Sequence, residues 1–368
     1  LLFTALITPA VSQEMTYQQA CERLKPLQLP DFWVGDVAGL STRLAQLKYG
    51  ISREIAQSPG QRPIHLIAYG EREEVAGKAN FNSAVGGRQL AAYMDKSARR
   101  KPVILFIGPV HGHEVEALTG LVNLIEVMET GRDLAGDDRS QLRQLGQKCR
   151  LLIIPAGNPD GIARFEPRCA HGMTHDEFQF WGQGTDHLHH ISFWPVSKRI
   201  HPRTGPTIGF LGCYFNDRGI NPMHDEFFAP MSTEAPAILK AAMQEGPDLA
   251  VSLHSHQSRP TILRPAYLPL EQQDAVIELA KACYQLFDER MLPHGGLFTA
   301  TPETGDPPKP FNLTSALYHV SGATSFTFEC PHGIDDPEAC PVSLSQILDI
   351  QLSLYESMMR FALESKAE

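Results

Sequence analysis

Residues 102–114 read PVILFIGPVHGHE, and this stretch combines a candidate core strand with a group of polar side chains. Its first half, from Val103 to Ile107, is a continuous apolar run that ends at Gly108. Such a run is typical of a strand buried on both faces, because a half-exposed strand alternates apolar and polar side chains. The sequence therefore predicts a central strand with polar chemistry at its carboxyl end.

Similar apolar runs occur along the chain and alternate with segments of helical periodicity. The other predicted strands are residues 64–69, 151–155, 249–253 and 325–328. The predicted helices, in which apolar residues recur every three or four positions, are residues 40–51, 114–131, 235–243, 271–287 and 344–361. This alternation predicts an α/β protein whose mostly parallel sheet is covered by helices on both faces.

One long stretch, residues 164–230, lacks this periodicity and is rich in Gly, Pro, His and Trp. In a compact domain an irregular segment of this length is usually functional or forms the wall of a site. It contains the run Asp186-His187-Leu188-His189-His190, whose residue types could bind a metal, but the run has no partner at a strand end and is interpreted as a polar loop.

The composition is that of an ordinary folded protein, with 368 residues, 42% of them hydrophobic and 20% charged. The formal net charge of -10 and the lack of a basic cluster beyond Arg99-Arg100-Lys101 argue against nucleic-acid binding. No segment approaches the roughly 20 apolar residues that a membrane-spanning helix needs. Seven cysteines without a CxxC pair are too sparse for a disulfide scaffold.

The first twelve residues, LLFTALITPAVS, resemble the end of a signal peptide, although its charged beginning is missing. The alternative is that the native chain starts at Met15. The first interpretation favours a periplasmic or secreted protein over a cytoplasmic one. We expect a signal-peptide remnant at residues 1–12, an N-terminal helical segment at 13–60 and one catalytic domain at 61–368.

Four polar clusters follow the carboxyl ends of predicted strands, at residues 111–114, 158–161, 254–257 and 329. In open α/β sheets this edge is where ligand sites form. His111 and Glu114 are three residues apart, so their side chains project to the same side if a helix begins there. An imidazole and a carboxylate suit Zn²⁺, but this pair alone is a weak signal.

The clusters carry four motifs that together resemble, in order and in predicted element, those of the zinc carboxypeptidases related to carboxypeptidase A. The motifs are His111-x-x-Glu114, Asn158-Pro159-Asp160-Gly161, Ser252-Leu253-His254-Ser255 and Ser325-Phe326-Thr327-Phe328-Glu329. The resemblance extends over roughly residues 64–361. It implies a three-layer α/β/α fold around a mixed, mostly parallel twisted sheet.

The resemblance also implies a cofactor and a reaction. One Zn²⁺ per chain would be held by His111, Glu114 and His254, which leaves a position open for catalysis. Glu329 would act as general base and acid for a metal-activated water that cleaves an amide bond. His113 and His256 flank the ligands and are assigned to the surrounding pocket.

Other family positions match less well. In the family an arginine after the NPDG turn polarises the scissile carbonyl; Arg164 and Arg168 both qualify by location here, and Arg168 is favoured. Met223 and His224 stand where the family carries the Asn-Arg pair that grips the terminal carboxylate of the substrate. The bidentate clamp is therefore missing at that place.

Three residues are candidates for substrate binding in place of that clamp or beside it. Arg218, or a protonated His224, would supply the lost charge, and Thr314 occupies the position of the side-chain selectivity determinant. Thr314 favours neither a basic nor a large apolar side chain. Unless Arg218 or another base has moved in, amidating a substrate's C-terminus should lower kcat/KM by about tenfold or less.

Two alternatives to a metallocarboxypeptidase acting on peptides remain at this point. A deacylase or amidase related to aspartoacylase and succinylglutamate desuccinylase would act on N-acyl amino acids. These enzymes share the HxxE motif with a later histidine, and they also have a glycine after the first ligand, as at Gly112. The NPDG and FTFE motifs resemble carboxypeptidases more closely. A non-catalytic binding protein of the same fold would be expected to have lost Glu329 or a ligand, and all four residues are present.

Overall fold

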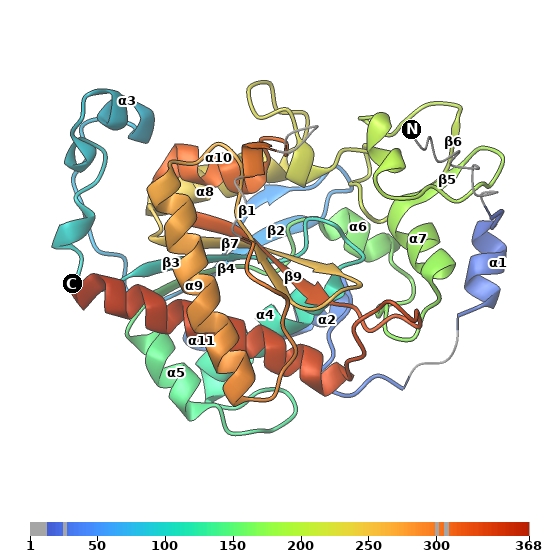
Figure 1. The fold of residues 1–368 in the computed structure, drawn as a ribbon, viewed down its shortest axis with the longest axis horizontal. Coiled ribbons are helices and arrows are strands. Elements are labelled where there is room, and N and C mark those ends of the chain that lie inside the picture. The colour runs from blue at the N-terminus through green and yellow to red at the C-terminus, as the bar shows by residue number, and fades with distance from the viewer. Residues whose placement is uncertain (1–12, 25–27, 299–301, 305–308, 368) are drawn as a thin grey trace, which may run out of the picture.

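The computed structural model describes residues 13–24, 28–298, 302–304 and 309–367 (Figure 1). The signal-peptide remnant expected at residues 1–12 lies outside the described residues. Within the described part of the chain, no helix has the length and the apolar character needed to cross a membrane.

A seven-stranded sheet forms the middle layer, in the order β1-β2-β4-β3-β7-β9-β8 (Figure 1). Its central strands β4, β3, β7 and β9 are parallel, whereas the β1–β2, β2–β4 and β9–β8 pairs are antiparallel. The strands are β1 (Ile51–Gln57), β2 (Pro63–Tyr69), β3 (Val103–Ile107), β4 (Arg150–Ile154), β7 (Leu249–His256), β8 (Thr261–Leu263) and β9 (Thr324–Pro331). A separate small sheet pairs β5 (Gly184–Asp186) with β6 (Ile208–Leu211).

Helices cover both faces of this sheet and complete the three layers (Figure 1). On one face lie α4 (Val115–Thr130), α5 (Ser140–Gln147), α9 (Leu270–Glu289) and α11 (Leu344–Ala367). On the other face lie α8 (Glu234–Glu245) and α10 (Leu313–Ser321). The remaining helices, at the periphery and around the site, are α1 (Tyr17–Glu22), α2 (Val37–Leu44), α3 (Phe81–Gly86), α6 (Pro159–Arg164) and α7 (His175–Gln183).

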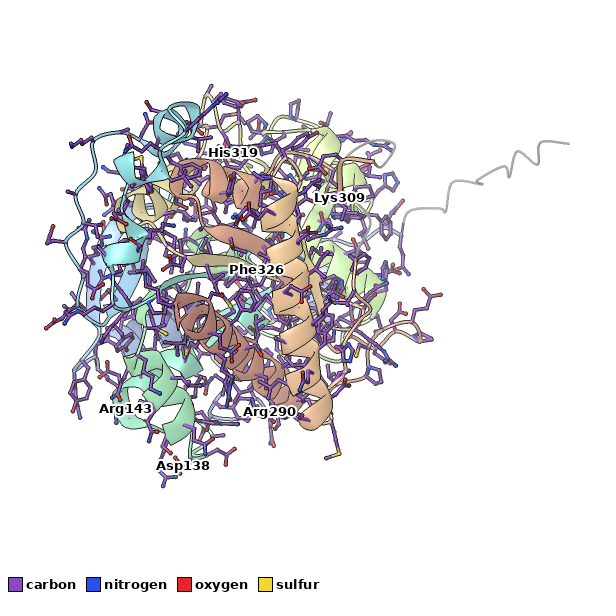
Figure 2. The ribbon with its side chains drawn as sticks, turned by 60° about the vertical axis from the view of Figure 1, so that its left-hand side comes forward. Asp138, Arg143, Arg290, Lys309, His319 and Phe326 are labelled. Atoms are coloured by element: carbon purple, nitrogen blue, oxygen red, sulfur yellow. The ribbon has the colours of Figure 1, made fainter. Side chains whose placement is uncertain are left out.

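The central strand β3 shows why both faces need a helical layer. All five of its side chains are buried. Ile104 and Phe106 belong to the apolar core on the α4 and α11 side, whereas Leu105 and Ile107 belong to the core under α8 and α10. Successive strand side chains point to opposite faces, so a strand without polar positions is stable only between two covers. Figure 2 shows Phe326 of β9 inside the same interior, with Arg290 and Asp138 at the periphery.

The predicted core elements are confirmed, with one difference at the N-terminal side. The helix expected over residues 40–51 ends at Leu44, and Ile51 opens the strand β1. Between them, the Glu129 carboxylate accepts hydrogen bonds from the backbone N–H groups of Lys48, Tyr49 and Gly50, which turns the chain towards the sheet. The helical prediction extended too far because the helical spacing of apolar residues continues past the end of α2 at Leu44. The sheet also begins earlier than residue 61, since β1 starts at Ile51.

Candidate metal and catalytic site

The candidate ligands lie at the carboxyl edge of the central parallel strands. His111 follows the end of β3, and α4 begins at Val115, directly after Glu114. His254 lies in β7 and Glu329 in β9, and the register of the two parallel strands pairs these residues directly. Equivalent residues of neighbouring strands point to the same face, so Glu329 stands beside His254.

Three side chains converge here: His111, Glu114 and His254 are all buried, and their ligand atoms lie within 4.8 Å of one another. Nδ1 of His111 is 2.9 Å from one carboxylate oxygen of Glu114, and Nδ1 of His254 is 2.9 Å from the other. The two Nδ1 atoms are 3.1 Å apart. Such a set of two imidazoles and one carboxylate matches the ligands of a catalytic zinc site.

The hydrogen bonds behind the imidazoles test whether these nitrogens are free to bind a metal. Oδ1 of Asn221 accepts the backbone N–H of Met223 at 2.9 Å, so it must also be the acceptor for Nε2 of His111 at 3.2 Å. His111 therefore carries its proton on Nε2 and presents a lone pair at Nδ1. Nε2 of His254 is likewise engaged, by Oγ of Ser252 at 2.9 Å. Partners of this kind orient metal-binding histidines.

Burial governs the protonation of this group. It lowers the pKa of His111 and of His254, and it raises the pKa of Glu114, where the neighbouring Glu329 carboxylate adds to the effect. The imidazoles are therefore neutral at neutral pH. Two imidazole nitrogens and a carboxyl group face one another at hydrogen-bonding distance, and a bound cation would be coordinated by all three and would favour the ionised form of Glu114. The residues present thus fit a divalent metal ion.

The NPDG motif holds the ligand loop in place. Oδ1 of Asn158 accepts the N–H of Gly161 at 2.9 Å, and its Nδ2 donates to the carbonyl of Val110 at 3.1 Å. At Gly112 a side chain cannot be accommodated, because an added Cβ would lie 2.0 Å from the backbone of Gly161. The two motifs are therefore packed backbone to backbone, which explains the glycines at both positions.

Glu329 is half-buried in the row of strand ends. Burial raises the pKa of its carboxyl group above the ordinary value, against the opposing charges of His254, His332 and Lys198. Glu329 is not one of the three residues of the ligand group. A carboxyl group of raised pKa beside a metal site is suited to proton transfer near neutral pH.

Behind the ligands, Glu116 and His332 form a fully buried ion pair, with 3.0 Å between Oε1 and Nδ1. Burial lowers the pKa of His332, but the carboxylates of Glu116, Glu114 and Glu329 outweigh it, and the pKa is raised overall. The pair packs against the ligand loop, since the His113 ring lies 6.2 Å from that of His332.

We expect Glu116→Ala to lower the free energy of unfolding by about 3 kcal/mol or more, because it leaves His332 buried without its partner. Urea denaturation monitored by circular dichroism measures this change. Glu278→Ala, which breaks the exposed pair with Lys281, serves as the control and should cost well under about 1 kcal/mol. Equal stability losses in the two variants would contradict the interpretation.

The other predicted site residues lie in different surroundings. Arg168 is exposed and pairs with Asp36 at 2.9 Å, and Arg164 pairs with Asp217 at 2.8 Å. Arg218 is exposed, and the fully buried Thr314 donates to Oδ1 of Asn312 at 2.7 Å. Within the described residues, no recorded contact joins these side chains to the ligand group, and their roles stay predictions.

His224 is connected to the site through a residue that the sequence analysis did not single out. Its Nε2 lies 3.2 Å from Nζ of Lys198, in the irregular stretch predicted to form a wall. Burial, with the charge of Lys198, lowers the pKa of His224 to about 3, so it is neutral at neutral pH. Tyr214 was also missed; its ring stacks on His111 with centroids 3.6 Å apart. Only the composition of the stretch pointed to this wall.

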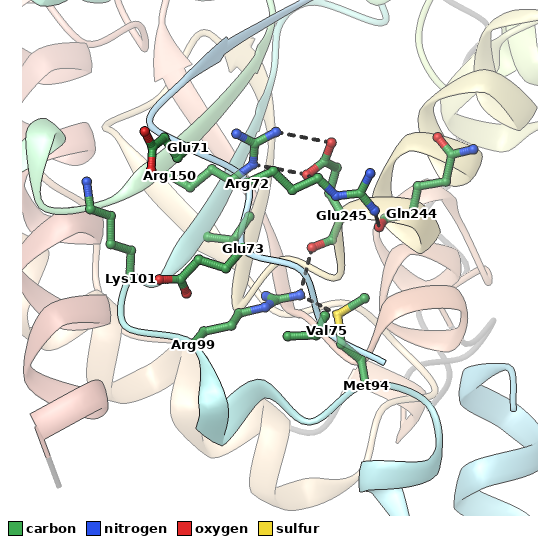
Figure 3. A pocket seen from close by; sticks show the side chains of 11 residues that line it. Glu71, Arg72, Glu73, Val75, Met94, Arg99, Lys101, Arg150, Gln244 and Glu245 are labelled. Carbon is green, nitrogen blue, oxygen red and sulfur yellow. Dashed lines mark hydrogen bonds and ion pairs between the residues drawn. The ribbon is translucent and has the colours of Figure 1, made fainter. Parts of the chain in front are cut away.

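A charged cavity at the opposite edge of the sheet is a different feature (Figure 3). It lies where β3 and β4 begin, and its lining includes Arg150 and Glu245. These two side chains form an ion pair at 3.0 Å, and Arg99 donates to the backbone carbonyl of Glu245 at 2.9 Å. Since Arg150 and Glu245 are paired with each other and the cavity faces away from the strand ends that carry the ligands, we assign it a structural role.

Comparison with known proteins agrees with this geometry. Residues 51–193 match the family model of zinc carboxypeptidases, beginning at the first residue of β1. No curated protein matches the chain.

Solved structures share the fold at low sequence identity. The metallo-carboxypeptidase from Burkholderia cenocepacia superposes with a TM-score of 0.54 at 14% identity, over 89% of this chain and 69% of the other. A protein from Burkholderia mallei assigned as a carboxypeptidase gives 0.55 at 15% identity, over 89% of this chain and 68% of the other. At this identity the superposition establishes the fold alone. The chain is thus similar to zinc carboxypeptidases in sequence over residues 51–193 and in fold, and it carries a His-Glu-His group that could hold a metal ion.

Proposed function

We propose that this chain is a metallocarboxypeptidase, which removes C-terminal residues from peptides by hydrolysing the last amide bond. The observation that carries the proposal is the convergence of two imidazole Nδ1 atoms on the two oxygens of one buried carboxylate. The pairing of Glu329 with His254 across β7 and β9 supports a proton-transfer group next to this centre. The match of residues 51–193 to the zinc carboxypeptidase family model supports the same reaction class.

In this proposal His111, Glu114 and His254 hold one zinc ion. A zinc ion in such a site acts as a Lewis acid, which polarises the scissile carbonyl and makes water a stronger nucleophile at neutral pH. The protein contributes fixed ligand geometry, because Asn221 and Ser252 hold the far nitrogens of the two imidazoles. Fixed ligands avoid reorganisation during the reaction.

Glu329 handles the protons. Its carboxylate accepts a proton from the attacking water and then donates a proton to the nitrogen of the leaving amine. The sum is one amide bond and one water converted into a carboxylate and an ammonium group. The pKa of Glu329, raised by burial, favours uptake of the proton from the water in the first half of this sequence.

The test is a substrate panel offered to the zinc-loaded protein, with products read by mass spectrometry. The panel contains peptides with free and with amidated C-termini, together with N-acyl amino acids. We expect stepwise loss of C-terminal residues from peptides, and loss of this activity after treatment with a chelator. Cleavage of N-acyl amino acids without cleavage of peptides would instead establish a deacylase, and no cleavage of any member would contradict the proposal.

A further inference from the structure

Lys198 lies in the short helical turn η3 (Val196–Arg199), within the irregular wall beside the ligand group. The turn is anchored to the protein interior, because Ser197 is fully buried and its Oγ donates to Oε1 of Gln183 at 2.5 Å. The next residue, Lys198, therefore leaves the backbone from a fixed point. Gln183 ends α7, so the anchor connects η3 to regular structure.

The ammonium group of Lys198 is held among rings. Nζ donates to Nε2 of His224 at 3.2 Å and lies 5.0 Å from the ring centroid of Trp194 and 5.5 Å from that of Tyr214. Both aromatic distances are in the range of cation–π attraction. Tyr214 also stacks on His111, with ring centroids 3.6 Å apart. The cation is thus separated from a candidate metal ligand by one aromatic ring.

This cation has no carboxylate partner within 4 Å in the parts of the chain that the structure describes. Burial lowers the pKa of Lys198 to about 8, against the more distant carboxylates of Glu114 and Glu329, so the amine is still mostly protonated at neutral pH. A partly buried ammonium normally pairs with an anion, because losing hydration without such a partner is costly. An anion from outside the chain would supply the missing charged partner of the Lys198 ammonium group.

We propose that Lys198 binds the terminal carboxylate of the peptide substrate, with His224 as the neutral acceptor that orients its ammonium group. This inference rests on the proposed function. His224 stands where the clamp arginine of the family was expected, and being neutral it does not supply the charge itself. Lys198 brings a positive charge to that place from another segment of the chain.

The structure therefore changes the expectation for amidated substrates. Without a cation at the clamp position, amidation should cost about tenfold or less, but a lysine charge in contact with the carboxylate increases the penalty. A hydrogen bond to a charged group corresponds to a factor of about thirty. Because an ammonium lacks the two-pronged geometry of a guanidinium, we expect a penalty below that of an arginine clamp.

The experiment compares the peptide cleaved best in the panel with its C-terminal amide, in the parent protein and in Lys198→Met. In the parent, kcat/KM should be about thirtyfold higher for the free acid. In Lys198→Met this ratio should fall to about threefold or less, through loss on the acid alone. Lys240→Met, which removes an exposed lysine of α8, should keep the parent's ratio. Lys198→Arg should restore most of the preference.

Two further measurements keep the outcomes distinct. Arg218→Met tests the alternative cation; if it abolishes the preference while Lys198→Met keeps it, the inference is wrong. An equal loss on acid and amide in Lys198→Met would also overturn it, because it would place Lys198 at the scissile bond. Calorimetric binding of the same acid and amide to folded Glu329→Gln protein, with and without Lys198→Met, gives the preference without turnover. An inactive parent therefore contradicts the proposed function, whereas equal binding of acid and amide to the Glu329→Gln protein contradicts the role of Lys198.

Discussion

Replacing Glu329 with glutamine is expected to lower kcat by at least about a hundredfold while leaving the metal bound. The two side chains have nearly the same shape, but an amide cannot take up the proton of water or return it to the amine. Glu329 lies beside His254 in the sheet and outside the group of three ligands, so the substitution should spare the metal site. Steady-state kinetics on the best peptide substrate, with zinc content by elemental analysis, measures both effects.

The control for this variant is Glu278→Gln, which changes an exposed carboxylate of α9 in the same way. It should retain the turnover and the zinc content of the parent. Near-normal turnover in Glu329→Gln would show that another group handles the protons. Loss of zinc together with activity would show that Glu329 helps to hold the metal.

The central fold could be predicted from sequence because its strands are buried on both faces. In β3 the lack of any polar position distinguishes a core strand from an edge strand, and its five-residue length between Pro102 and Gly108 distinguishes it from a helix. The carboxyl ends of such strands share one edge, so the polar residues that follow them could be grouped without a structure. His254 and Glu329, which are far apart in sequence, are direct neighbours for this reason.

The edge of the sheet was harder to predict than its centre. Ile51 follows Leu47 at helical spacing, but it lies in an edge strand with 72% of its surface exposed. The chain is turned into β1 by the Glu129 carboxylate, which is about eighty residues away in sequence. A local pattern of apolar residues does not contain a long-range contact of this kind.

The sequence predicted that the irregular stretch forms a wall of the site, but it did not indicate which of its side chains face the site. Lys198 reaches His224 because Ser197 is held by Gln183, and no periodic pattern links these residues in the sequence. In the sequence, His224 stands at the place of the missing clamp. The positive charge comes from Lys198, which lies in an irregular segment 26 residues earlier and is hydrogen-bonded to His224.

Removing the imidazole of His254 is expected to weaken zinc binding by at least about a hundredfold. Changes to groups that only support a metal ligand typically cost ten- to a hundredfold in affinity, and loss of a ligand itself should reach or exceed this range. His254→Ala leaves one imidazole and one carboxylate at the site, and no other His, Cys or carboxylate among the described residues belongs to the group. Zinc per chain, measured after dialysis against a zinc buffer that saturates the parent, reports the loss.

A thermal measurement separates metal release from simple unfolding. A metal that binds the folded state raises its melting temperature, so zinc should stabilise the parent against heat and should stabilise His254→Ala much less. His294→Ala is the matched control, because this imidazole pairs with Asp288 at the end of α9, away from the ligand group. It should keep both the zinc content and the thermal shift. Full zinc occupancy in a folded His254→Ala protein would mean that the metal is held by other side chains, and the roles assigned to His111 and Glu114 would then be lost as well.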